Sequence, residues 1–165
     1  MARHEDNRED LFAEATAYDR RAEVIVGDSD QPILFGEKAD GAWSIYFSAD
    51  HVFHFDATGR LKRAFVDGRL YRTQGDTLAE LSRERLKDVT VLRRRDLQNL
   101  ERDRFIASLR IRLTALLTAS ERGELRILRE RPPYSDPITR LATVVRKSLA
   151  APDADFLAPR FRGKR

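Results

Sequence analysis

Apolar and polar residues alternate with a period of two between residues 33 and 74. In the stretch AWSIYFS, Trp43, Ile45 and Phe47 fall on one side of an extended chain, and the stretch HVFHFD continues the pattern. Because successive side chains of a β-strand point to opposite faces, this period predicts strands that bury one face. Turn-forming pairs separate these stretches, as in consecutive hairpins: Asp40–Gly41, Ala49–Asp50, Thr58–Gly59 and Asp67–Gly68. The segment therefore predicts an antiparallel meander of about five strands.

The next segment, residues 77–94, fits two interpretations. Its composition favours a helix, whereas the run Val89-Thr90-Val91-Leu92 and the rhythm of hairpins before it favour strands. We favour one or two further strands that end near Arg94, which extends the predicted meander over residues 33–94.

A period of 3.6 residues follows the meander and predicts a long helix over residues 96–120. Asp96 is the expected N-cap and Gly123 the expected stop. The apolar stripe lies within one arc of the helical surface and should pack on the aromatic face of the sheet: Phe105, Ile106, Leu109, Leu113, Leu116 and Leu117.

Shorter helices are predicted towards both ends of the chain. Over residues 7–22, apolar side chains recur at helical spacing: Leu11, Ala15, Tyr18 and Ala22. Over residues 137–150, Asp136 and Pro137 supply a cap and a first helical position. The elements together predict an α+β fold with a single domain over residues 1–150. The remaining basic C-terminal tail, residues 151–165, alternates Pro, Phe and basic residues in a way typical of disorder.

The aromatic residues divide into two expected groups. One group should form the inward face of the sheet under the long helix: Trp43, Phe47, Phe53 and Phe55. Tyr46 and Tyr71 are the expected aromatic residues of an exposed face, where bases of a single-stranded nucleic acid could stack.

Charge is segregated along the chain, although the net charge is only +4. Residues 1–58 hold 5 basic and 13 acidic residues, whereas residues 59–165 hold 26 basic and 14 acidic ones. This asymmetry indicates a basic binding surface, two halves that attract each other, or both. Of the 31 basic residues, 26 are Arg, a preference that a GC-rich genome would also produce.

Composition also bounds the classes of protein. With no cysteine, the chain has no disulfide framework, no thiolate metal site and no cysteine nucleophile. No apolar run reaches the roughly 18 residues needed to span a bilayer, and the N-terminal segment MARHEDNRED is charged where a signal peptide is apolar. We therefore expect a cytoplasmic protein without a membrane partner.

The hairpin at residues 55–72 combines a turn with unusual charge. A two-residue type I′ turn at Asp67–Gly68 would place Phe65 opposite Leu70 and Arg63 opposite Arg72. A three-residue loop with a bulged Gly68 would instead place Lys62 opposite Arg72, so like charges are paired in either register. Two arginines opposed across a strand pair are destabilising unless an acid or an anion lies between them. Either the acidic N-terminal segment or a bound phosphate could supply that negative charge.

Part of this hairpin resembles the YD-type repeat, whose pattern is aromatic-Asp-x-x-Gly-Arg-Leu. The residues that carry the resemblance are Phe55-Asp56 and Gly59-Arg60-Leu61, which occur once and cover under a tenth of the chain. The resemblance implies a hairpin and no particular function.

Catalytic signatures are sparse. The sequence contains no Gly-rich phosphate loop and no GxSxG elbow. His51 and His54, three apart on a strand, should point to opposite faces and not share a metal. His54 and Asp56 should share a face, where a carboxylate could orient an imidazole for acid–base chemistry.

The leading hypothesis is a non-enzymatic binding or adaptor module whose basic half contacts an acidic partner, with RNA or DNA as the first candidate. The expected contacts are Arg60, Lys62, Arg69, Arg72, Arg93, Arg94, Arg95, Tyr71 and the terminal RFRGKR. One alternative is a small enzyme that acts on an anionic substrate through His54 and Asp56. Another is a subunit that pairs with itself or another protein through an open sheet edge. No cofactor or metal is expected.

Overall fold

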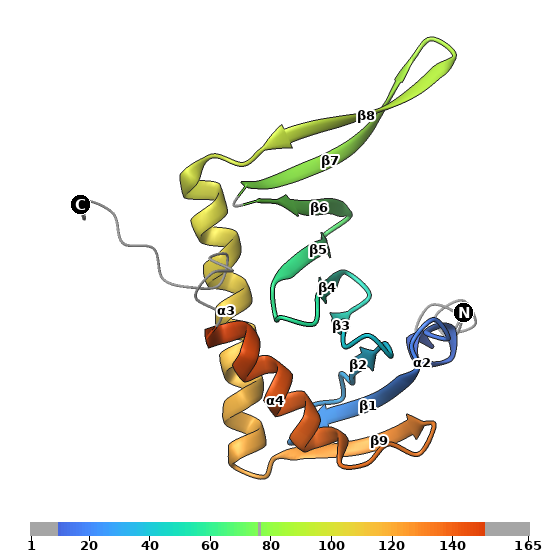
Figure 1. The fold of residues 1–165 in the computed structure, drawn as a ribbon, viewed down its shortest axis with the longest axis vertical. Coiled ribbons are helices and arrows are strands. Elements are labelled where there is room, and N and C mark those ends of the chain that lie inside the picture. Colours follow the sequence, from blue (N-terminus) through green and yellow to red (C-terminus); the bar gives the residue numbers. More distant parts are fainter. Residues whose placement is uncertain (1–9, 76, 151–165) are drawn as a thin grey trace, which may run out of the picture.

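The computed structural model describes residues 10–75 and 77–150. Its centre is a nine-stranded sheet in the order β8-β7-β6-β5-β4-β3-β2-β1-β9, with every neighbouring pair antiparallel (Figure 1). The predicted α+β meander is thereby confirmed. The strands are β1 (Arg20–Val26), β2 (Ile33–Glu37), β3 (Trp43–Ser48), β4 (His51–Phe55), β5 (Leu61–Val66), β6 (Arg69–Gln74), β7 (Thr77–Leu86), β8 (Val89–Asp96) and β9 (Leu125–Arg131). The helices are α2 (Leu11–Glu14), α3 (Asn99–Glu121) and α4 (Pro137–Ala150).

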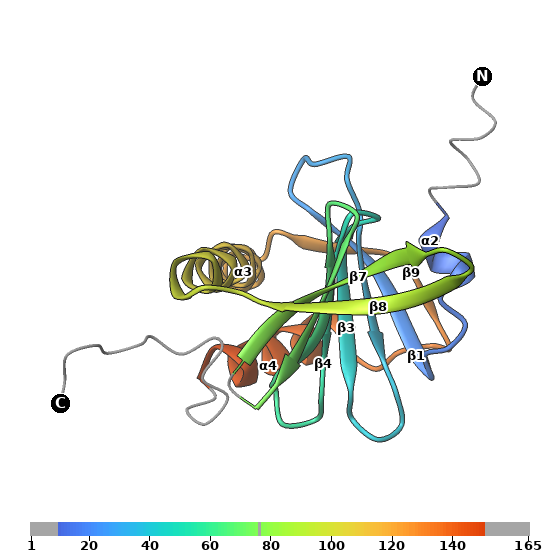
Figure 2. The ribbon, with the colours of Figure 1, turned by 90° about the horizontal axis from the view of Figure 1, so that it is seen from above.

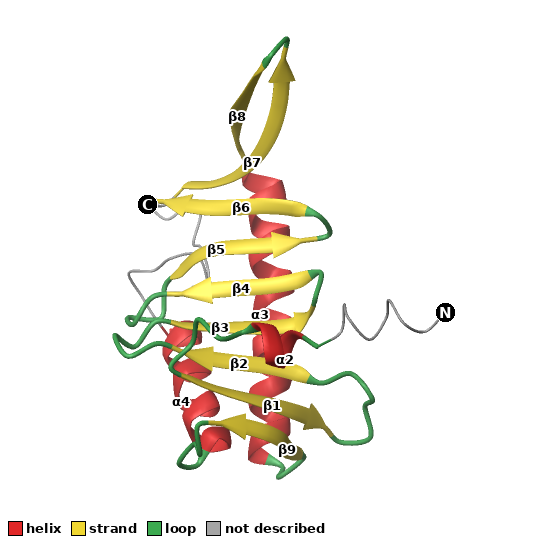
Figure 3. Ribbon diagram, turned by 90° about the vertical axis from the view of Figure 1, so that its right-hand side faces the viewer, coloured by secondary structure: helices red, strands yellow, loops and turns green. Residues whose placement is uncertain are grey.

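The helices divide the sheet into two faces. Both α3 and α4 lie against one face, which we call the inner face, and α2 lies on the opposite, outer face near β1 and β2 (Figures 2 and 3). Among the described elements, α2 is the only helix on the outer face, so β4 to β8 present that face without a covering helix (Figure 3). Within the described residues, no helix has the length and apolar character to cross a membrane.

The core lies between the inner face and the two long helices. The predicted inward aromatics Trp43, Phe53 and Phe55 are 1–3% exposed, and Phe47 packs against them, which confirms that prediction. From α3, the buried side chains include the predicted stripe residues Ile106, Leu109, Leu113 and Leu116. Burial of this stripe under the aromatic face is the main contact between helix and sheet.

The predicted helix over residues 96–120 is confirmed, but its predicted cap is wrong. Asp96 is the last residue of β8 and pairs with Ala79. The helix begins at Asn99 with Gln98 as N-cap, and the Gln98 backbone N–H donates to Glu101 Oε1 at 3.0 Å. The strand continues to Asp96 because β7 offers a hydrogen-bonding partner that the local sequence does not reveal.

The predicted helix over residues 7–22 is largely wrong. The described helical segment is only Leu11–Glu14, where Asp10 accepts from the backbone N–H of Ala13. Residues 20–26 form β1, which pairs with β2 on one side and with β9 on the other. A strand with two partners satisfies its backbone on both edges, and this outweighs an accidental helical spacing of apolar residues.

Two further segments complete the sheet. The strands favoured for residues 77–94 are confirmed as β7 and β8, and the predicted helix over residues 137–150 is confirmed as α4. The sequence did not predict strand β9. Its only apolar residues are Leu125, Ile127 and Leu128, and its partner β1 lies about 100 residues earlier. The predicted tail over residues 151–165 lies outside the described residues.

Candidate functional site

The hairpin of β5 and β6 has the register of the two-residue type I′ turn and not that of the alternative three-residue loop. Asp67 and Gly68 have φ values of 52° and 82°, as a type I′ turn requires. Arg63 lies directly opposite Arg72, and Phe65 lies opposite Leu70. Arg63 and Arg72 are exposed, and they project on the outer face because the adjacent Ala64 is buried on the inner face.

The opposed arginines have no acidic partner among residues 10–75 and 77–150: neither Arg63 nor Arg72 makes an ion pair there. The N-terminal acid Asp10 pairs instead with Arg129, at 2.9 Å. In the part of the chain that the structure describes, the internal neutralisation considered for this hairpin is therefore not found. The two guanidinium groups therefore repel each other, and a bound anion would relieve this repulsion.

Beside this pair lies a pocket of about 330 Å³ on the outer face, which we call the outer pocket. Three cations reach it: Lys38 after β2, and Lys62 and Arg63 on β5. Lys62 belongs to a β-bulge, because His54 pairs with Arg63 while Phe55 pairs with Leu61. The extra residue places two consecutive basic side chains at one pocket. The other lining residues are Ala17, Tyr18, Ala42, Trp43, Ser44, His54, Phe55 and Asp56.

His54 lies in the outer pocket as a neutral imidazole. Its Nδ1 and Ser44 Oγ are 2.6 Å apart, within a hydrogen bond. Burial, followed by the nearby charges of Arg63 and Lys38, lowers the pKa of His54 to about 4. The same cations that depress this pKa would be neutralised by an anion in the pocket.

Asp56 also lines the outer pocket, but its carboxylate holds the following turn. Oδ1 accepts from Thr58 N at 2.9 Å, from Thr58 Oγ1 at 2.6 Å and from Arg60 N at 3.1 Å. Burial would raise the pKa of Asp56, but these hydrogen bonds outweigh burial and lower it. This is the hairpin turn that the YD-type resemblance implies.

The catalytic pairing of His54 with Asp56 stays a prediction. The structure brings both residues to one pocket, yet their described hydrogen bonds go to other groups. Ser44, the hydrogen-bonding partner of His54, is only 4% exposed, so its hydroxyl has little access to a substrate. The two histidines point to opposite faces as expected, and the described residues contain no cluster of His, Asp or Glu suited to a metal ion.

An apolar band runs beside the arginine pair across the outer face. Val52, Phe65, Leu70 and Leu81 are directly paired from β4 to β7, and the row ends at Arg94 on β8. Phe65 is 37% exposed and Leu70 is 39% exposed. Because Phe65 and Leu70 lie two residues from Arg63 and Arg72 along their strands, the apolar band and the basic row are about 7 Å apart.

Four of the other predicted arginines are engaged with acids: Arg69, Arg93, Arg94 and Arg95. Ion pairs link Arg93 to Glu84 (2.6 Å), Arg95 to Glu80 (2.9 Å) and Glu101 (3.1 Å), Arg94 to Asp96 (2.8 Å) and Arg69 to Glu80 (3.9 Å). Hydrogen bonds from Arg95 to Glu101 and Glu80 raise its pKa. Strand alternation also divides these side chains, since Arg69, Arg93 and Arg95 point to the inner face and Arg94 to the outer one.

Tyr71 is not on an exposed face, so that expectation is wrong. It lies on the inner face, half-buried, with its ring centroid 4.9 Å from that of Phe105 on α3. Tyr46 lies on the outer face but is also half-buried, with its hydroxyl 3.4 Å from that of Tyr18. Burial, followed by this hydrogen bond, raises the pKa of Tyr46.

The outer face contains residues that the sequence reasoning did not assign to a site. Lys38 joins it through the pairing of β2 with β3, and Phe65 and Leu70 join it through the register of the hairpin. The register that pairs Arg63 with Arg72 could have indicated Phe65 and Leu70, because residues two apart on a strand share a face.

Comparison of the chain with protein-family models, with curated proteins and with solved structures finds no match.

Proposed function

We propose that this protein binds single-stranded nucleic acid across the outer face of its sheet. The observation that carries the proposal is the direct pairing of Arg63 with Arg72, exposed and without an acidic partner in the described chain. Two such guanidinium groups form a site at which a phosphate relieves repulsion and accepts charge-assisted hydrogen bonds.

The apolar band supports a single strand as the partner. Proteins that bind single strands combine a basic track for the phosphates with exposed apolar or aromatic side chains on which bases stack. Here Arg63 and Arg72 provide the track, and Phe65 and Leu70 lie parallel to it on the same uncovered face (Figure 3). A folded duplex would reach the phosphate row but not place bases on Phe65.

The outer pocket extends the track beyond the hairpin. Lys38 and Lys62 line this pocket together with neutral His54, so a second phosphate would meet two ammonium groups and an imidazole able to take up a proton. The footprint on this proposal runs from Lys38 through Arg63 to Arg72.

The proposal is tested by fluorescence anisotropy with labelled single-stranded RNA and DNA at about 50 mM salt, where phosphate contacts are strongest. The double variant Arg63→Gln/Arg72→Gln should weaken binding by about tenfold or more. The matched control, Arg93→Gln/Arg95→Gln, removes the same charge from arginines that pair with acids and should bind nearly as the parent does.

A further variant separates bases from phosphates. Phe65→Ala should weaken binding of the oligonucleotides but not of polyglutamate, an anion without bases. Absence of oligonucleotide binding would reject the proposal, and equal loss in both double variants would reject this footprint. Binding of polyglutamate as tight as that of RNA would favour an acidic protein partner instead.

The projecting hairpin of β7 and β8 favours a second function, pairing with another protein chain. It extends beyond the body of the sheet, and β8 is an edge strand (Figure 1). Leu86, Val89 and Leu92 near its end are 54–59% exposed. Light scattering over a range of protein concentrations tests self-pairing, and Leu92→Lys should reduce any dimer, whereas a monomer at all concentrations would exclude it.

A further inference from the structure

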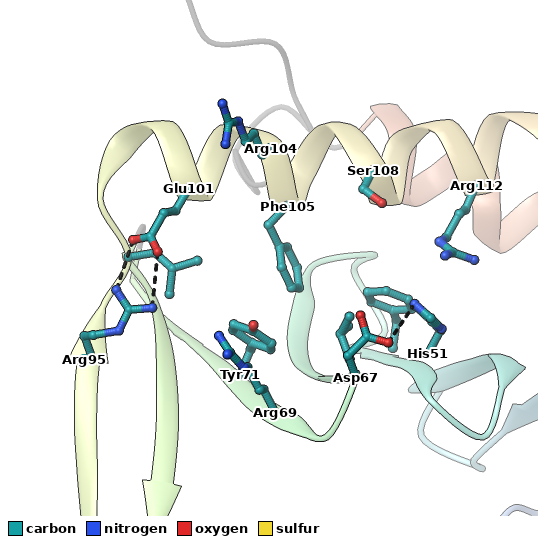
Figure 4. Close-up of a pocket in the computed structure, with 13 residues that line it drawn as sticks. His51, Asp67, Arg69, Tyr71, Arg95, Glu101, Arg104, Phe105, Ser108 and Arg112 are labelled. Carbon is teal, nitrogen blue, oxygen red and sulfur yellow. Dashed lines mark hydrogen bonds and ion pairs between the residues drawn. The ribbon is translucent and has the colours of Figure 1, made fainter.

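A second cleft lies on the inner face, on the side of the sheet opposite the proposed nucleic-acid track. It has a volume of about 360 Å³ and separates β4, β5 and β6 from the first half of α3. Ser108 and Arg112 point from α3 towards the sheet, where His51 and Asp67 lie (Figure 4). We call this the inner cleft.

The arginines of the inner cleft differ in their partners. At one end, Arg95 is held by Glu101 (Figure 4). At the other end, the Arg112 guanidinium lies 5.4 Å from the centroid of the Phe47 ring, and it has no acidic partner in the described chain. His51 Nε2 is 3.7 Å from Asp67 Oδ1, so that acid already faces a histidine. Arg112 therefore keeps its planar set of N–H donors available for a ligand.

An apolar recess begins on the other side of Arg112. Its volume is about 220 Å³, and Arg112 lines both this recess and the inner cleft. Apart from Arg112, every residue that lines the recess is apolar: Val26, Ile33, Phe47, Ala115 and Leu116. The inner cleft and the apolar recess thus meet at Arg112, and we call the two together the groove along α3. In this groove a cation without an acidic partner in the described chain lies beside an apolar hollow.

We propose that this groove binds an amphipathic anion, a carboxylate with a short acyl chain, with the carboxylate on Arg112 and the chain in the apolar recess. A guanidinium matches the two oxygens of a carboxylate in bidentate geometry. The Ser108 hydroxyl lies on the same side of α3 and adds a donor at the head group. An apolar hollow with one oriented polar anchor is the usual composition of a small-molecule site.

The test is isothermal titration of the full chain with octanoate below its micelle concentration, with propionate and 1-octanol as probes that lack the chain or the charge. Octanoate should bind more tightly than either probe. Arg112→Gln should weaken octanoate by about tenfold or more, the loss expected for a charge-assisted hydrogen bond, and should leave 1-octanol unchanged. Arg126→Gln, which removes an exposed arginine of β9, is the matched control.

A second pair of variants tests the recess. Ala115→Phe should fill the hollow and weaken octanoate but not propionate, whereas Thr114→Phe, the adjacent exposed position on α3, should have little effect. Thermal melts of the four variants establish that each is folded. Octanoate binding that is absent, that equals propionate binding, or that survives both Arg112→Gln and Ala115→Phe would overturn the proposal.

Discussion

At the scale of single residues, the pKa of His54 depends on its burial and on the positive charge of the outer pocket. Its imidazole lines this pocket together with Lys38 and Arg63 and is hydrogen-bonded to Ser44. Burial and the two cations lower its pKa from 6.5 to about 4. Because the unfolded chain has no such surroundings, its histidine takes up a proton at a pH where the folded chain does not.

This difference predicts that stability falls as the pH falls from about 6.5 to about 4, since protonation in that window favours the unfolded chain. The expected loss is on the order of 1–3 kcal/mol, reduced by the solvent that still reaches the ring. Urea denaturation at a series of pH values measures it. His54→Asn should flatten the profile in this window and His51→Asn should not; identical profiles would contradict the prediction.

A second residue-scale feature is the buried carboxylate of Glu37, which is 0% exposed. It accepts from the Tyr134 hydroxyl and from Arg140 Nε at 2.7 Å, and Arg20 lies 3.9 Å away. These contacts link β2 to the segment before α4, through Tyr134, and to α4 itself, through Arg140. Burial, followed by the hydrogen bond to Glu37, raises the pKa of Tyr134.

Removing the Tyr134 hydroxyl should therefore be costly. Tyr134→Phe leaves a buried carboxylate with one donor fewer, and we expect a loss of about 1–3 kcal/mol in the free energy of unfolding. Tyr18→Phe is the control, because its hydroxyl makes one longer contact, 3.4 Å to Tyr46, in a less buried place. Chemical denaturation of both variants tests this, and equal costs would contradict the role of Glu37.

At the scale of elements, the turns between strands differ in what lies against them. Gly59 and Gly68 both have positive φ, at 95° and 82°. A Cβ on Gly68 would meet nothing within 4 Å, whereas a Cβ on Gly59 would lie 3.0–3.2 Å from atoms of Lys147 in α4. The turn before β5 is thus also a packing contact for the last helix.

We predict that Gly68→Ala costs about 1–2 kcal/mol from backbone strain alone. Gly59→Ala should cost more, by on the order of 1–3 kcal/mol, because the methyl group also displaces α4. Thermal melts of the two variants give the comparison, with Gly68→Val expected to be worse than Gly68→Ala. A Gly59→Ala variant no less stable than Gly68→Ala would mean that α4 does not pack on this turn.

The elements also show what the sequence could predict. Asp67–Gly68 restricts the register of its hairpin to two alternatives, and the structure confirms the one that pairs Arg63 with Arg72. The sequence did not predict strand β9, and it wrongly predicted a helix over residues 7–22. Both errors have one cause, because β1 and β9 stabilise each other across about 100 residues of chain. Local periodicity does not record such a partner.

For the candidate site, the sequence indicates which residues are basic but not which face of the sheet they occupy or which acids they pair with. Nearness in sequence groups Arg93, Arg94 and Arg95, but strand alternation sends Arg93 and Arg95 to the inner face and Arg94 to the outer one. Their acidic partners are on neighbouring strands or on α3, as with Glu101. Which arginines remain without an acid depends on these long-range contacts, and only the folded chain shows them.

At the scale of the whole molecule, the charge asymmetry of the sequence has two outcomes. Acids of residues 1–58 pair with arginines of the basic half: Asp10 and Glu23 with Arg129, and Glu37 with Arg140. These pairs confirm that the two halves attract each other. The basic residues without such partners include Arg63 and Arg72, and the proposed function depends on that remainder.

The salt dependence of binding tests this account most directly. Anisotropy titrations with one single-stranded oligonucleotide, repeated from about 50 to 200 mM salt, give a log–log slope of about −0.7 for each phosphate contact. Arg63→Gln/Arg72→Gln should make that slope shallower by roughly 1.4, the loss of two contacts. Arg93→Gln/Arg95→Gln should leave it unchanged. An unchanged slope in the first variant, or an equal change in both, would contradict the claim that the opposed arginines hold the phosphates.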